Sequence, residues 1–161
     1  MSDLATALQI AIKAHAGQRD KQGEPYLLHV LRVVEAVGSE RAKVLAALHD
    51  VWEAGSALDL EDVFEQEGMF IANSLEVLTR SEDETYAEYI QGIADGHSST
   101  WAEEIREVKL ADLRDNLGRI PLPPSPAHPD GLAALARWEG EEWRWLRVRY
   151  TRAIAILEAA S

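Results

Sequence analysis

Residues 45–53, LAALHDVWE, place the adjacent pair His49 and Asp50 in an apolar run whose spacing has the period of an α-helix. The interior face of this helix is expected to include Leu45 and Trp52 as well. Adjacent side chains on an α-helix point about 100° apart. His49 and Asp50 can therefore share one ligand only if it lies beside this helix and other segments approach it.

Two further segments carry residues of the same chemistry: GQRDKQGEPYLLHV (17–30) contains His29, and VKLADLRDNL (108–117) contains Asp112. Because the chain has no cysteine, histidine and carboxylate side chains are the available metal ligands. Two neutral imidazoles with two carboxylates suit Mn²⁺, Fe²⁺, Mg²⁺ or Zn²⁺. A single histidine on an apolar helical face is more often a satisfied core residue, but the joint pattern favours a metal site. The predicted ligands of one divalent ion are His29, His49, Asp50 and Asp112.

The helical period extends over most of the chain, and no segment shows the alternation of a β-strand. Helices are predicted at residues 4–15, 31–37, 42–52, 59–64, 69–78, 86–93 and 105–112, and after residue 131. Glycine and proline mark the connections, most clearly in the loop 17–27 and in the proline-rich segment 120–131. We therefore predict a single all-α domain over residues 1–161, with the metal ligands on interior-facing helices.

Two local signals refine the last helices. Thr100 with Glu103 has the spacing of a capping box, which predicts the start of the helix that carries Asp112. Gly140 interrupts the segment RWEGEEWRWLRVRY (137–150) and predicts a break in the final helix. The tryptophans of this segment are expected to pack against the protein, and its charged side chains are expected to face water.

Composition limits the partners. The chain has 161 residues and a formal net charge of −12. Polymeric nucleic acid and anionic membranes both favour a basic face, so neither is expected to bind. Local cations in a cleft can still hold a small phosphorylated ligand, which is the expected partner. The N-terminal segment lacks the features of a signal peptide and no apolar run is long enough to span a bilayer, so a cytoplasmic protein is expected, with homo-oligomerisation left open.

Together, GQRDKQGEPYLLHV, LAALHDVWE and VKLADLRDNL resemble the HD-domain metal-dependent phosphohydrolases, and among them the alarmone hydrolases of the RelA/SpoT type. The resemblance extends from the first predicted helix to about Leu117. It implies an HD-domain helical bundle, one divalent ion with Mn²⁺ as the expected metal, and a small stand-alone hydrolase without a synthetase domain. The implied reaction removes the 3′-pyrophosphate from a guanosine tetra- or pentaphosphate alarmone (ppGpp).

Two residues near the ligands acquire roles through this resemblance. Glu53 follows His49 by four residues, on the same helical face one turn along, and in the family the glutamate at this position handles the proton of the attacking water. The alternative is an exposed glutamate near a helix end. Asn116 stands four residues beyond Asp112, where the family places an asparagine against the substrate. Otherwise Asn116 has no special role.

Basic side chains near the motifs are candidates for binding phosphate. They are Arg19, Lys21, Lys109, Arg114 and Arg119. Lys21 aligns with a substrate-binding lysine of the family, whereas Asp20 stands where the family has an arginine. Each of these cations taken alone is more often a solvated surface charge. Tyr86 is a candidate for lining a base pocket, with packing in the core as its alternative role.

A second departure from the family is Ala54, where the alarmone hydrolases usually carry an acid directly after the catalytic glutamate. Asp20 and Ala54 leave two alternatives open: an HD-type phosphohydrolase of another nucleotide, or a catalytically weak nucleotide-binding sensor. Retention of the four ligands and Glu53 argues against a pure sensor, since a binder does not need a proton-handling residue. A helical interaction module with incidental histidines and aspartates is the remaining alternative.

Overall fold

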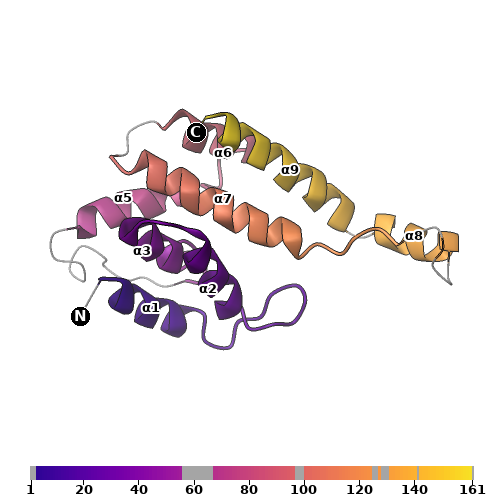
Figure 1. Ribbon diagram of the computed structural model, residues 1–161, viewed down its shortest axis with the longest axis horizontal. Coiled ribbons are helices and arrows are strands. Elements are labelled where there is room, and N and C mark those ends of the chain that lie inside the picture. Colours follow the sequence, from indigo (N-terminus) through magenta and orange to yellow (C-terminus); the bar gives the residue numbers. More distant parts are fainter. Residues whose placement is uncertain are drawn as a thin grey trace.

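The computed structural model describes residues 3–55, 67–96, 100–124, 127, 131–140 and 142–160 (Figure 1). The helices are α1 (Asp3–Ala14), α2 (Leu27–Ala36), α3 (Glu40–Leu48), α5 (Gly68–Leu78), α6 (Tyr86–Asp95), α7 (Ala102–Gly118), α8 (Gly131–Gly140) and α9 (Trp143–Ala159). Extended pairing among the described residues is limited to an isolated antiparallel bridge between Arg19 and Pro25. The predicted all-α fold class is therefore confirmed. The helix predicted at 59–64 lies outside the described residues, as do His97 and His128, which are expected to be structural or exposed.

Helix α7 is central to the arrangement, with α2, α3 and α5 on one side and α6 and α9 on the other (Figure 1). Large side chains that are fully buried among these helices are Leu45, Leu48, Ile71, Leu75, Ile90, Ile105, Leu113 and Leu157. Burial of this apolar surface is the main favourable contribution to folding. It also fixes the positions of the polar side chains that α7 carries.

The C-terminal half of helix α3, residues 44–48, is buried on every side. Residues 44–48 are at most 4% exposed, and α1, α2, α5 and α7 all pack against this helix. A helix that is apolar around its whole circumference belongs in a core rather than at a surface. His49, the residue that follows this segment, therefore lies in the protein interior.

The helix predicted over 42–52 ends earlier than expected. Helix α3 stops at Leu48, and residues 49–55 form consecutive tight turns. The imidazole Nδ1 of His49 donates to the Ala46 carbonyl at 2.7 Å, so this side chain uses an acceptor that a continuing helix would offer to its backbone. His49 keeps helical backbone angles at this end, and its side chain meets that of Asp50, with Nε2 of His49 2.9 Å from Oδ2 of Asp50.

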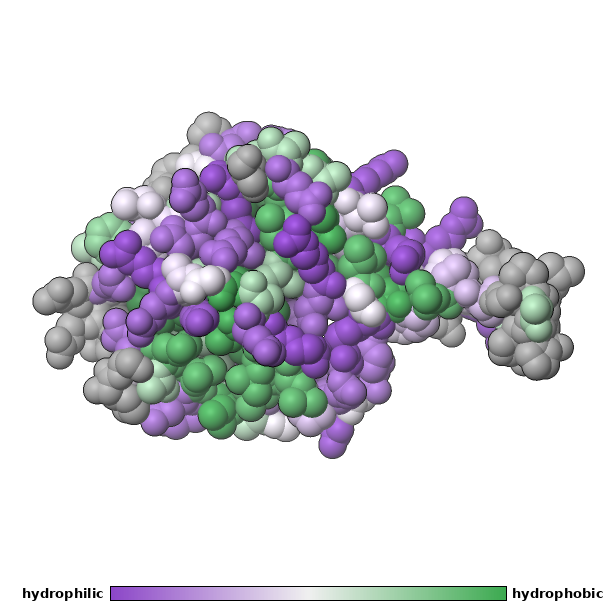
Figure 2. All heavy atoms as spheres, viewed as in Figure 1, coloured by the Kyte–Doolittle hydropathy of each residue, from purple (hydrophilic) through white to green (hydrophobic). Residues whose placement is uncertain are grey.

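The surface alternates between charged and apolar side chains. Figure 2 shows apolar side chains gathered over the region of α2 on one face, where Leu28 and Leu31 are each 42% exposed. None of the helices in the described part of the chain combines the length and the apolar character needed to cross a bilayer. Helix α8 lies beyond the end of α7, away from the other helices, and contacts α9 (Figure 1).

The capping box predicted at Thr100 is wrong. Helix α7 begins after Trp101, and the side chain of this N-cap residue makes no capping hydrogen bond. A capping box occurs instead at the start of α6, where the Thr85 hydroxyl accepts the Glu88 N–H and the Glu88 carboxylate accepts the Thr85 N–H. By contrast, the break predicted at Gly140 is confirmed, since α8 ends there and α9 begins at Trp143.

Loss of this capping box should destabilise the protein measurably. Thr85→Ala is expected to lower the free energy of unfolding by about 1 kcal/mol, because the first turn of α6 loses a hydrogen-bond acceptor. Thr100→Ala is the matched control and is expected to change it by less than about 0.5 kcal/mol, since Thr100 is exposed and does not cap α7. Urea unfolding followed by circular dichroism measures both. Equal destabilisation by the two variants would contradict the assignment.

Candidate metal centre

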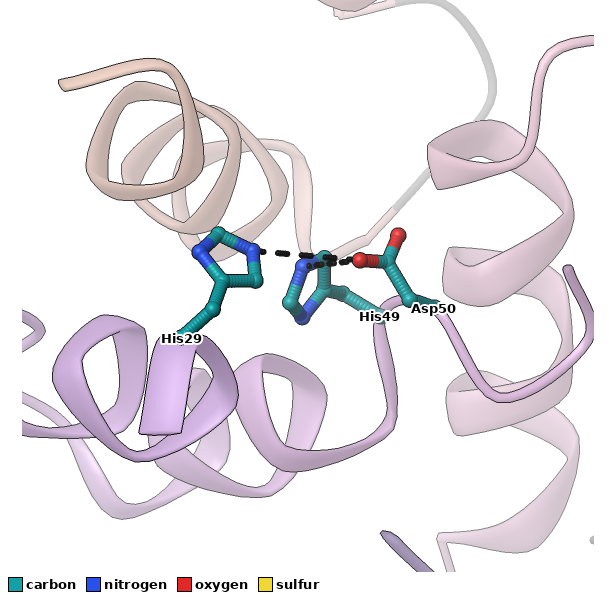
Figure 3. Close-up of side chains that lie close together, drawn as sticks. All are labelled: His29, His49 and Asp50. Carbon is teal, nitrogen blue, oxygen red and sulfur yellow. Dashed lines mark ion pairs between the residues drawn. The ribbon is translucent and has the colours of Figure 1, made fainter. Parts of the chain in front are cut away.

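The four predicted ligands come from three elements that meet in the interior. His29 lies near the start of α2, His49 and Asp50 follow α3 directly, and Asp112 lies within α7. His29, His49 and Asp112 are each at most 5% exposed. Packing of α2, α3 and α7 against one another carries these side chains into the same space. Figure 3 shows the imidazoles of His29 and His49 facing the Asp50 carboxylate.

The ligand atoms lie at separations that suit a bound cation. Asp50 Oδ2 is 2.9 Å from Nε2 of His49 and 3.8 Å from Nε2 of His29. Asp112 Oδ1 is 3.4 Å from Nε2 of His29 and 4.0 Å from Nε2 of His49. Ligand atoms about 2.1 Å from an octahedral ion lie about 3.0 Å apart when adjacent and about 4.2 Å apart when opposite. His29, His49 and Asp50 therefore lie close enough together to hold one small divalent ion, and Asp112 Oδ1 lies within 4.0 Å of both imidazoles.

Both imidazoles are held with Nε2 facing this point. Nδ1 of His29 lies 2.7 Å from Asp115 Oδ2, and Nδ1 of His49 lies 2.7 Å from the Ala46 carbonyl. Because a carboxylate and a carbonyl only accept hydrogen bonds, each Nδ1 carries the proton and each Nε2 presents a lone pair. Both Nε2 atoms are buried without a hydrogen-bond partner. This arrangement is costly unless another group, such as a metal ion, satisfies the two nitrogens.

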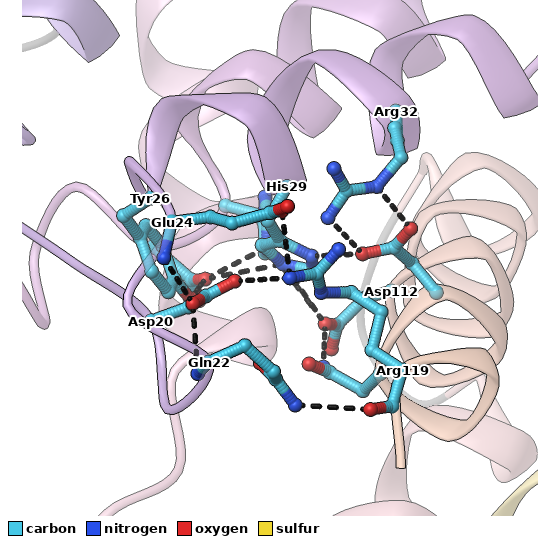
Figure 4. Close-up of polar contacts among 12 residues, drawn as sticks. Asp20, Gln22, Glu24, Tyr26, His29, Arg32, Asp112 and Arg119 are labelled. Carbon is cyan, nitrogen blue, oxygen red and sulfur yellow. Dashed lines mark hydrogen bonds and ion pairs between the residues drawn. The ribbon is translucent and has the colours of Figure 1, made fainter. Parts of the chain in front are cut away.

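Neighbouring donors orient the two carboxylates. The Tyr26 hydroxyl donates to Asp50 Oδ2. Lys109 Nζ donates to Asp112 Oδ2 at 2.8 Å, and the Asn116 amide donates to Asp112 Oδ1. Figure 4 shows Tyr26 and Asp112 within this network of polar contacts. Asn116 thus forms a hydrogen bond with a predicted metal ligand, and it also lines the cavity beside the candidate metal centre.

The electrostatics of the cluster favour a positive charge between its members. Burial alone would lower the pKa of His49, but Asp50 and Asp112 raise it to about 9. The pKa of His29 is also raised, by Asp112 acting against burial. Burial alone would raise the pKa of Asp112, but Lys109 and the two imidazoles lower it. A divalent ion would supply the charge that these groups otherwise obtain from protons.

Asp115 is a candidate functional residue that the motifs did not identify. Its carboxylate accepts a hydrogen bond from His29 and two from Arg32, at 2.6 and 3.0 Å. Although burial acts in the opposite direction, these contacts lower the pKa of Asp115. A carboxylate behind a metal-binding imidazole fixes its tautomer and raises its basicity. The available sequence signal was the position of Asp115 three residues after Asp112, on the same helical face.

A cavity of about 370 Å³ opens beside the ligands, and its wall includes His29, Asp50, Asp112 and Glu53. Burial raises the pKa of Glu53, and the negative charge of Asp50 adds to this effect. A carboxyl group with a raised pKa is better matched to proton transfer near neutral pH than an ordinary glutamate. The fold therefore brings the predicted proton-handling residue and three of the four predicted ligands to one cavity.

Four of the candidate phosphate-binding cations line this cavity: Arg19, Lys21, Lys109 and Arg119. Arg19 donates to the Gly23 carbonyl at 2.6 Å. Lys21 pairs with Glu142 at 2.9 Å, with both side chains more than half exposed. Each of these cations can face a ligand only in competition with an oxygen of the protein.

Arg114, also predicted to bind phosphate, lies outside the cavity. It pairs with Glu158 of α9 at 2.7 Å and borders a separate depression beside Arg32 and Asp115. Two residues along an α-helix correspond to about 200° of rotation, so Arg114 faces away from Asp112. We therefore leave it out of the proposed site.

Asp20 organises the loop 17–27. Its Oδ1 accepts the backbone N–H groups of Gln22 and Glu24 at 2.9 and 2.8 Å, and its Oδ2 pairs with Arg119 at 2.7 Å (Figure 4). Although burial acts in the opposite direction, these contacts lower the pKa of Asp20. The acid that stands where the resembling family has an arginine is thus neutralised by an arginine at the end of α7.

No protein-family model matches the chain. Over 111 residues, 66% of its length, the chain is 27% identical to a protein of Arabidopsis thaliana named "Putative GTP diphosphokinase RSH1, chloroplastic". A second protein of the same name and organism matches with the same identity and coverage. The chain spans only 12% of the length of these curated relatives.

Among solved structures, the chain resembles one described as "A metazoan ortholog of SpoT hydrolyzes ppGpp and plays a role in starvation responses". The TM-score is 0.59 at 23% sequence identity, and the match covers 99% of this chain and 94% of the other. The chain therefore shares the fold of a SpoT ortholog. The helical bundle implied by the RelA/SpoT-type resemblance is confirmed at this level.

Removal of either an imidazole or a carboxylate from the centre should eliminate metal binding. His49→Ala and Asp112→Ala are each expected to abolish stoichiometric binding of a divalent ion, because the neighbouring side chains cannot replace the lost ligand atom. Metal content after dialysis, measured by inductively coupled plasma mass spectrometry, checks this. His15→Ala is the matched control, since His15 is also 3% exposed with an unpartnered Nε2 but lies outside the cluster. Wild-type metal content in both ligand variants would rule out the site.

Asp115 should act on metal affinity through His29. Asp115→Ala is expected to weaken the affinity for Mn²⁺ by about 10- to 100-fold, because His29 loses the carboxylate that fixes its tautomer. Isothermal titration calorimetry gives the dissociation constant. Glu103→Ala, which removes an exposed acid from the same helix, is expected to leave the constant unchanged. If both variants behave alike, Asp115 has no specific effect on the centre.

Proposed function

We propose that this chain is a metal-dependent phosphohydrolase that removes the 3′-pyrophosphate from a guanosine tetra- or pentaphosphate alarmone. The observation that carries the proposal is the pair of buried, unpartnered Nε2 atoms of His29 and His49, which face two carboxylates on the wall of a cavity. A structural protein gains nothing from leaving two such nitrogens unsatisfied. The fold shared with a SpoT ortholog supports the choice of substrate.

In this proposal His29, His49, Asp50 and Asp112 hold one divalent ion, with Mn²⁺ as the expected metal. When bound, such an ion polarises a phosphoryl oxygen and lowers the pKa of water at the site. Lys109 and Asn116 keep the Asp112 carboxylate in one orientation.

Glu53 is the proposed proton-transfer residue. It lines the cavity next to Asp50 and Asp112, and its pKa is raised by burial and by the nearby negative charge. It would accept the proton of the attacking water and return a proton to the 3′ oxygen when the bond to pyrophosphate breaks. The products are pyrophosphate and the nucleoside 5′-diphosphate or 5′-triphosphate.

Asp20 and Ala54, the two departures from the resembling family, have different consequences for the choice of substrate. Asp20 adds no free negative charge to the cavity, because Arg119 neutralises it and the loop backbone donates to it. Ala54 leaves the position after Glu53 without an acid. The missing acid is the observation that favours the second candidate, hydrolysis of another phosphorylated nucleotide by the same groups.

The proposed activity is tested with protein dialysed against a chelator and reloaded with Mn²⁺. The wild type is expected to release pyrophosphate from ppGpp only when loaded, and Glu53→Gln is expected to retain the metal while kcat falls on the order of 10²-fold. Glu35→Gln, an exposed glutamate on α2, is the control and should keep wild-type turnover. Ion chromatography of the products provides the measurement.

Two results would contradict the proposal. A loaded protein that leaves ppGpp intact and cleaves another nucleotide would decide for the second candidate. Unchanged turnover of Glu53→Gln would remove Glu53 from the mechanism.

A further inference from the structure

The cations predicted from the motifs are already engaged by protein oxygens where they line the cavity. They are Arg19, Lys21, Lys109 and Arg119. Each donates to a carbonyl or carboxylate oxygen at 2.6 to 2.9 Å. An incoming phosphate would have to displace these contacts to gain a charge-assisted hydrogen bond of its own.

Arg149 of α9 also lines the cavity, and it is held differently. Its guanidinium carbon lies 3.6 Å from the centroid of the Tyr86 ring and 4.8 Å from that of the Trp145 ring. Its Nε is buried without a hydrogen-bond partner, and Arg149 forms no ion pair with any residue that the structure describes. The charged side chains of 137–150 were expected to face water, whereas Arg149 is half-buried against two aromatic rings.

Stacking of this kind suits a guanidinium that receives an anion. Aromatic faces attract the cation and restrict its orientation, while the N–H groups at its edge remain able to donate. The cavity wall also presents the acids Asp50, Asp112 and Glu53, which repel phosphate. A cation without a carboxylate partner is therefore the group with which this cavity attracts a phosphate most effectively.

We infer that Arg149 is a substrate-binding residue that holds a phosphate group of the nucleotide, and that Tyr86 and Trp145 position it. This inference rests on the proposed function, which makes the ligand a polyphosphate. It identifies α9 as part of the substrate site, although the sequence motifs end before this helix. It also gives Tyr86 a defined role as the ring beneath a phosphate-binding guanidinium.

The test measures binding of inorganic pyrophosphate to Mn²⁺-loaded protein by isothermal titration calorimetry, with metal content checked after each titration. Arg149→Gln is expected to weaken pyrophosphate binding by about 10-fold or more, because a charge-assisted hydrogen bond is lost. Arg152→Gln is the matched control: it removes the same charge one turn along α9, from an exposed residue that does not line the cavity. It is expected to change the affinity by less than about twofold, since exposed charges act weakly through solvent.

Arg149→Lys separates binding from folding. It keeps the charge but not the planar stack, and is expected to bind pyrophosphate more weakly than wild type at an unchanged unfolding midpoint. If Arg149→Gln does not fold, the pyrophosphate affinity of Arg149→Lys tests the inference instead. Wild-type affinity in the folded Arg149 variants, equal losses in Arg149→Gln and Arg152→Gln, or a wild type that binds no pyrophosphate would each overturn the inference.

The hydrolysis assay keeps this outcome distinct from that of the proposed function. If the wild type leaves ppGpp intact but Arg149→Gln weakens pyrophosphate binding, the inference about Arg149 holds and the proposed alarmone hydrolysis fails. If the wild type hydrolyses ppGpp and Arg149→Gln has the same KM and the same pyrophosphate affinity as the wild type, the proposed function holds and the role of Arg149 is refuted.

Discussion

The burial of two imidazole nitrogens opposite two carboxylates is the constraint on which the rest of the structure depends. Polar atoms in this position are tolerated only if each has a partner. His29 and His49 use their Nδ1 atoms for Asp115 and for the Ala46 carbonyl, and their Nε2 atoms remain to be satisfied in the centre. The positions of the predicted ligands and the hydrogen bonds of their Nδ1 atoms keep both Nε2 atoms directed at the two carboxylates.

Helix α7 supplies most of the supporting groups because of its period. Lys109, Asp115 and Asn116 each stand three or four residues from Asp112, on its side of the helix. Asp112 enters the centre, Lys109 and Asn116 hold its two oxygens, and Asp115 holds the histidine contributed by α2. One helical face thus determines the geometry of ligands that come from three separate elements.

The sequence predicted most of the helices, and it predicted that His29, His49 and Asp50 lie together, because both leave local signals. Apolar spacing marks helices, and the ligands stand in short motifs. What it could not predict depends on contacts between distant residues. The hydrogen bond between His29 and Asp115 joins α2 to α7, and the setting of Arg149 requires a ring from α6. The outward direction of Arg114, by contrast, follows from helical rotation alone and was available in the sequence.

The choice between two capping signals shows another limit. Thr85 and Thr100 both precede a glutamate by three residues, yet only Thr85 caps a helix. Spacing identifies a residue able to cap, whereas the packing of the following turn decides whether the helix begins there. Trp101, buried at 4% exposure, occupies the N-cap position of α7 instead.

Among the contacts that hold the loop 17–27 against the rest of the molecule, those with α7 and with α9 differ in strength. Toward α7, Arg119 pairs with Asp20 and its carbonyl accepts from Gln22, with both charged side chains largely shielded from water. Toward α9, Lys21 meets Glu142 through an ion pair that is mostly exposed, and such pairs are weakened as salt screens them. Rising ionic strength would therefore loosen the rim of the cavity on the α9 side first.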